Sequence, residues 1–171
     1  MTYCENTTVC DSGVINEAIP QQASTPLISS FSISGTLLTG SFRVQTFIPH
    51  VSSGQLSIWL TSPWNETFQL ATEAGGSRRN YFNGTVWDNG AKWLASDTDY
   101  RLNGLATVLR PASQFTSGDP NGVWSLGISD NLWVGAGSLL RWVLDFSRES
   151  HLLWFSISFG IQFSQPPPPF W

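Results

Sequence analysis

Apolar and polar residues alternate with a period of two along most of the chain after its first 28 residues. This alternation is typical of β-strands that bury one face and turn the other to solvent. We therefore predict a series of short half-buried strands. The side chains expected to face inward are Phe31, Ile33, Phe42, Val44, Thr46, Ile48, Leu56, Ile58, Leu60, Phe68, Leu70, Trp124, Leu126, Ile128, Leu140, Trp142, Leu144 and Phe146.

Turn-forming residues separate these runs. Glycine, asparagine and aspartate cluster at 75–76, 83–84, 119–122 and 135–137, and these residues accept positive φ or favour a bend. No stretch keeps a period of 3.6 residues. The pattern predicts an all-β chain folded as an antiparallel β-sandwich with almost no helix. It does not fix the order of the strands.

The two ends of the chain depart from this pattern. Residues 1–28 are polar and contain Pro20 and Pro26, so we predict an irregular lead-in or linker. Residues 148–171 combine an apolar run with four consecutive prolines. The apolar run is shorter than the roughly 20 residues of a bilayer-spanning helix, so we expect no transmembrane span. Three readings stay open for this tail: a membrane-surface anchor, a ligand for a proline-binding domain, or an aberrant end.

Composition narrows the class of protein. The chain has 171 residues, 41% of them hydrophobic, which is enough for one domain with its own core, expected over residues 29–147. Charged residues make up 12%, and the net charge is −4 with no Lys/Arg cluster. Nucleic acid binding requires a basic surface, so we exclude nucleic acid as a partner.

Two features indicate the secretory pathway. Cys4 and Cys10 lie close together without a second Cys or His pair, so we expect a local disulfide rather than a zinc site. Three N-x-[ST] triplets, at Asn6, Asn65 and Asn83, are candidate glycosylation sites. The first residues lack the features of a signal peptide, which suggests a piece of a longer secreted precursor.

Ordered motifs resemble one known family. The runs Gly-x-Trp-x-Leu at 122–126 and Gly-x-Leu-x-x-Trp at 137–142 carry the resemblance, together with 55–60, 80–82 and 109–111. This order is similar to the P domain, or Homo B domain, of kexin- and furin-like subtilisin proteases. The resemblance implies a galactose-binding-like jelly roll that performs no catalysis. It also implies a role in folding and stabilising a subtilisin-like serine endopeptidase, whose catalytic domain would be the partner in the same chain.

Two residues, Asp11 and His50, are candidates for a catalytic role. Asp11, in Asp-Ser-Gly, resembles the motif around the catalytic aspartate of subtilisins, but no His-Gly or Gly-Thr-Ser motif accompanies it. A triad needs all three groups within hydrogen-bond reach, so we expect no catalytic residue. His50 stands where P domains commonly carry a structural histidine, and the sequence shows no acidic partner for it.

The resemblance also makes calcium a candidate ligand, because some P domains bind it. Asp88 and Asp130 fall on predicted turns and could supply oxygen ligands. The chain departs from the family pattern by carrying Gln55 and Asn89 where carboxylates are usual. Calcium is therefore a possible cofactor, but we favour the interpretation that these acidic residues make turn-capping hydrogen bonds.

Trp59 is the candidate anchor of a binding surface. It should face outward between the inward residues Ile58 and Leu60, and exposed aromatic residues commonly mark an interface. The resemblance favours packing on a protease catalytic domain. The alternative function is a free-standing sugar-binding or adhesive β-sandwich module.

Overall fold

The computed structural model describes residues 2–22, 25–36, 42–88, 93–94, 108–110, 118–133 and 135–146. The predicted tail, 148–171, lies outside these residues. The described elements are β1 (Thr2–Glu5), β2 (Val9–Asp11), β3 (Glu17–Ala18), β4 (Leu27–Ser34), β5 (Arg43–Ile48), η1 (Ser53–Gln55), β6 (Leu56–Thr61), β7 (Thr67–Thr72), β8 (Phe82–Trp87), β9 (Trp93–Leu94), β10 (Val108–Arg110), β11 (Gly122–Asp130), β12 (Ser138–Leu139) and β13 (Arg141–Asp145).

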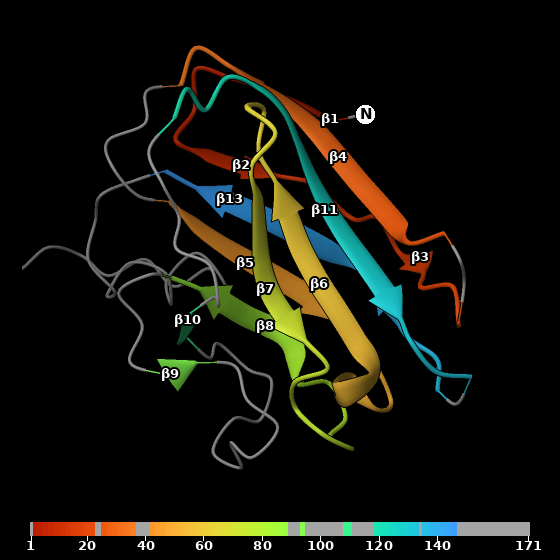
Figure 1. Cartoon of the computed structure of the whole chain (residues 1–171). Helices are drawn as coiled ribbons and strands as arrows, with labels where there is room; N and C mark the ends of the chain where they lie inside the picture. Colours follow the sequence, from red (N-terminus) through yellow and green to blue (C-terminus); the bar gives the residue numbers. More distant parts are fainter. Residues whose placement is uncertain are drawn as a thin grey trace, which may run out of the picture.

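Two sheets face each other across the core (Figure 1). One has the order β1-β4-β11-β6-β7 and the other β2-β13-β5-β8-β10-β9, with a small β12-β3 pair beside them. The long central pairs are antiparallel, and parallel pairing occurs only where β1 meets β4 and β10 meets β8 and β9 among the described strands. The predicted all-β sandwich is confirmed. The jelly-roll connectivity stays a prediction.

Aromatic rings from both sheets fill the core. Phe42 contacts Phe68, Trp124 and Phe146 with ring centroids 4.9 to 5.8 Å apart. Phe31 stacks on Trp142 at 4.1 Å. The side chains predicted to face inward are buried, except that Leu140 is only half-buried. Burying each large apolar side chain contributes about 1.5 to 3 kcal/mol, so the alternating pattern itself drives the two sheets together.

The first 28 residues differ from the expected irregular lead-in. β1 pairs with β4 in the first sheet, and β2 pairs with β13 in the second. Cys4 and Cys10 form a disulfide with their Cα atoms 5.7 Å apart, and it joins these two strands across the sandwich. Hydrogen bonds to distant strands organise this segment. Its own short polar sequence carries no periodicity that could reveal the strands.

Candidate functional site

His50 sits in a tight space just beyond β5. Its backbone forms an isolated antiparallel bridge with Gly137, and its ring packs against that glycine. A Cβ added to Gly137 would lie 2.2 Å from the ring carbon Cδ2 of His50. The ring can therefore occupy this position only because residue 137 has no side chain.

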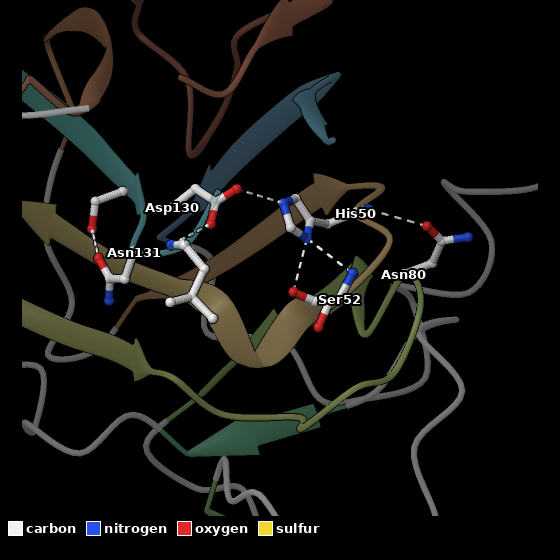
Figure 2. A network of polar contacts seen from close by, with 7 residues as sticks. His50, Ser52, Asn80, Asp130 and Asn131 are labelled. Atoms are coloured by element: carbon white, nitrogen blue, oxygen red, sulfur yellow. Dashed lines mark hydrogen bonds and ion pairs between the residues drawn. The ribbon is translucent and has the colours of Figure 1, made fainter. Parts of the chain in front are cut away.

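A buried carboxylate lies at the other side of the ring (Figure 2). Nε2 of His50 lies 3.2 Å from a carboxylate oxygen of Asp130, and both side chains are at most 1% exposed. Nδ1 faces the backbone of Ser52, whose N–H is 3.1 Å away and whose carbonyl oxygen is 2.9 Å away. In the neutral tautomer protonated on Nε2, the ring donates to Asp130 and accepts from the Ser52 N–H.

Further bonds connect the pair to neighbouring loops. The His50 N–H donates to the side-chain oxygen of Asn80 at 3.1 Å, and the Asn80 N–H donates back to the His50 carbonyl at 2.8 Å. The second carboxylate oxygen of Asp130 accepts from the N–H of Leu132 at 3.2 Å. The network thus joins the ends of β5 and β11 to the loops beside them.

This network suits a structural role rather than catalysis. The side chains of His50 and Asp130 are both buried, and the contacts from Ser52 to the ring come from its backbone, so they supply no nucleophile. The structure corrects the sequence interpretation that His50 lacks an acidic partner. Asp130 is that partner, 80 positions further along the chain, and no local motif links the two residues.

The residues considered for calcium are not brought together. Asp88 forms an ion pair with Arg43 at 2.8 Å, while Asp130 is occupied by His50. Arg43 begins β5 and His50 follows its end, so the two pairs are roughly 20 Å apart at about 3.3 Å per strand residue. Within the described part of the chain, no group of three His, Cys, Asp or Glu could hold a metal ion. The pair does not fit a shared calcium site.

Asp11 also has a structural role. Its carboxylate accepts hydrogen bonds from the N–H of Gly13 at 2.9 Å and from Nε of Arg141 at 2.9 Å. The hydroxyl oxygen of Ser12 accepts a hydrogen bond from the N–H of Trp142. The resemblance of this motif to a subtilisin aspartate therefore reflects a turn that is tied to β13.

Trp59 points outward, away from the core, as its strand position predicts. It is half-buried because its ring covers Gly127 on β11, where an added Cβ would meet Cε2, Cζ2 and Nε1 at 2.2 to 2.5 Å. In register with Gly127 on the other side lies Ile28 of β4. Most other outward positions on these central strands are serine or threonine: Ser30, Ser32, Ser57, Thr61, Thr67, Ser125 and Ser129.

One loop presents apolar side chains to solvent. Leu132 and Trp133, directly after β11, are 52% and 72% exposed, and Val51 is also exposed. Val51 is close to this loop because its N–H donates to the carbonyl of Ala136. This apolar tip lies at the same end of the sandwich as His50 and Asp130.

The three glycosylation triplets occupy different environments. Asn6 and Asn65 are exposed and adopt positive φ angles of 50° and 63°. Asn83 lies inside β8 and is half-buried, and the hydroxyl of Thr85 in its triplet is buried and donates to the Tyr81 carbonyl at 2.8 Å. The first two sites are open to a glycan, and the third is constrained.

The chain belongs to the proprotein convertase P-domain family, whose profile matches residues 39–146, well over half of its length. Two crystal structures of a serine protease of Aeromonas sobria are similar to it, one in complex with a chaperone (TM-score 0.50) and one without (0.49). Both are 17% identical over 81% of this chain, and the chain spans about a quarter (26%) of their length. At this identity the likeness concerns the fold alone. No curated protein matches the chain. The described residues contain no helix that could cross a bilayer.

Proposed function

We propose that this chain is a non-catalytic P domain that assists the folding and stability of a secreted subtilisin-like serine endopeptidase. The family match over residues 39–146 carries the proposal. It is supported by the structural use of His50 and Asp11, the two residues that a catalytic reading would need. The partner is a subtilisin-like catalytic domain in the same chain. The Cys4–Cys10 disulfide and the exposed Asn6 and Asn65 triplets support passage through an oxidising secretory compartment.

Stabilisation would come from apolar burial against the catalytic domain. At about 25 cal/mol per Å², a few hundred Å² of apolar contact contributes several kcal/mol, which is comparable to the whole stability of a typical domain. Trp59 is our candidate anchor because it combines an outward position with a large apolar ring.

The test is to produce the parent catalytic domain with and without this P domain. We expect the two-domain protein to unfold at a higher temperature and to be recovered in greater yield, and Trp59→Ser to reduce both gains while leaving the isolated P domain folded. Equal stability with and without the P domain would contradict the proposal. The P domain alone should hydrolyse no peptide above background, and hydrolysis abolished by Asp11→Ala would overturn its non-catalytic assignment.

A sugar-binding module is the second candidate, and one observation favours it. The ring of Trp59 covers a glycine on a face rich in hydroxyl groups, which resembles the aromatic platforms that stack on sugars. Loss of glycan-array binding in Trp59→Ser, with protease stabilisation intact, would select this alternative.

A further inference from the structure

Strand β4 is paired on both sides only over Phe31, Ser32 and Ile33, three of its eight residues. On one side β11 pairs with it from Leu27 to Ile33. On the other side β1 pairs only with Phe31 to Ser34. Among the described strands, none is in register with the remaining residues on this side, from Leu27 to Ser30. An open strand edge is a template for a further strand.

A groove of about 340 Å³ runs beside this open edge. Its lining combines residues of this edge with residues of the N-terminal segment: Ile28, Ser29 and Ser30 from β4, and Thr2, Ser12, Val14, Ile15 and Glu17. The N-terminus of the described chain lies beside the middle of β4, so β1 starts where the open edge ends (Figure 1).

The register of β1 defines how a chain would enter the groove. Thr2 is in register with Phe31 in a parallel ladder, so residues ahead of Thr2 would align in turn with Ser30, Ser29, Ile28 and Leu27. Four residues of strand span about 13 Å. They would supply backbone partners to the open edge, and β-strand addition of this kind gains affinity from main-chain hydrogen bonds.

We propose that this groove holds the segment that leads into β1, extending the β1–β4 ladder as far as Leu27. The proposal rests on the proposed function, since a catalytic domain preceding the P domain would be joined to it through this segment. The exposed side chains of Val14 and Ile28 and the carboxylate of Glu17 favour a segment with apolar residues and a basic one.

This path determines which end of the sandwich meets the catalytic domain. Leu27 is in register with Ile128 of β11, and the chain reaches Leu132 and Trp133 a few residues after Ile128. Gly127, the residue before Ile128 on β11, is in register with Trp59 of β6. The segment therefore leads to the end that carries both the apolar tip and the candidate anchor, and a catalytic domain delivered there could cover them together.

The experiment lengthens the full chain by Val-Lys-Val ahead of Met1 and measures amide hydrogen exchange by NMR. A matched chain carries Gly-Pro-Gly instead, since proline cannot donate a backbone hydrogen bond. We expect groove-facing amides between Leu27 and Ser30 to exchange at least tenfold more slowly with Val-Lys-Val than in the unextended chain, and to be unchanged with Gly-Pro-Gly. The amides of β11 serve as an internal reference for global stability.

Unchanged exchange with Val-Lys-Val, or equal protection by both extensions, overturns the proposal. Neither result bears on whether the P domain stabilises a protease, because the experiment contains no catalytic domain. Conversely, protection of the edge together with no stabilisation of the catalytic domain would retain the groove assignment and reject the proposed function.

Discussion

The indole ring of Trp59 covers the Cα of Gly127 on the adjacent strand, and the absence of a side chain at position 127 makes this contact possible. Gly127 has no positive φ, so space rather than backbone conformation accounts for the glycine. The contact holds a large aromatic side chain against the outer face of the sheet in a defined orientation. Any partner that binds Trp59 therefore meets a ring that is already placed.

Gly127→Ala should displace that ring. The new Cβ would lie 2.2 Å from Cε2 of Trp59, so the ring must lift away and lose its packing, at a cost of about 1 kcal/mol. In a Trp59→Ser background the same substitution should be nearly neutral. Urea unfolding of the four proteins gives the coupling energy. An equal cost in both backgrounds would show that the ring does not respond to residue 127.

His50→Ala should be among the most damaging single substitutions. It leaves the buried carboxylate of Asp130 without its hydrogen-bond donor on the ring, and an unsatisfied buried acceptor costs about 1 to 3 kcal/mol, or more when it is charged. Asp130→Asn is the matched control, because its amide oxygen can still accept from Nε2 of His50, so its cost should be smaller. Chemical denaturation measures both. The order would be reversed if the ring were held mainly by its other contacts.

Glycan occupancy should follow exposure. Expressed in a eukaryotic secretory host, the chain should carry glycans at Asn6 and Asn65 but little at Asn83, where the strand and the buried Thr85 restrict access. Mass spectrometry of the intact protein measures this, with an Asn→Gln variant of each site as control. Full occupancy of Asn83 would mean that modification precedes the folding of β8.

A chain that ends at Ser147 should fold and be more soluble than the full chain. β13 is the last strand of the sheets among the described residues, and the core residue Phe146 is retained in this truncation. Circular dichroism and thermal melts of the two chains provide the comparison. If the truncated chain is unfolded, the apolar run at 152–163 is a core strand and the predicted domain boundary is misplaced.

The central strands were predictable because the alternation of apolar and polar residues in each strand shows which of its side chains are buried. In β6, Leu56, Ile58 and Leu60 are fully buried while the residues between them are half-buried, as a period of two requires. β11 shows the same relation at Trp124, Leu126 and Ile128. These strands need only a second sheet against which to pack, whatever its topology.

Features that depend on distant partners were not predictable. β3 is two residues long, and hydrogen bonds to β12 define it rather than any pattern of its own. The pairing of His50 with Asp130 likewise depends on where β5 and β11 end in space. From its residue type alone Asp130 is a candidate calcium ligand, and only the fold reveals that its carboxylate faces a buried histidine.

The position of β2 has a consequence for the timing of synthesis. Val9 pairs with Asp145, so a strand made early in this domain must wait for one of the last strands of the sandwich. At 5 to 20 residues per second the delay is roughly 10 s, during which this edge has no strand partner. Cys10 needs no such wait, since Cys4 is only six positions away. The covalent link can form first, so the loop between Cys4 and Cys10 can close before either sheet is assembled.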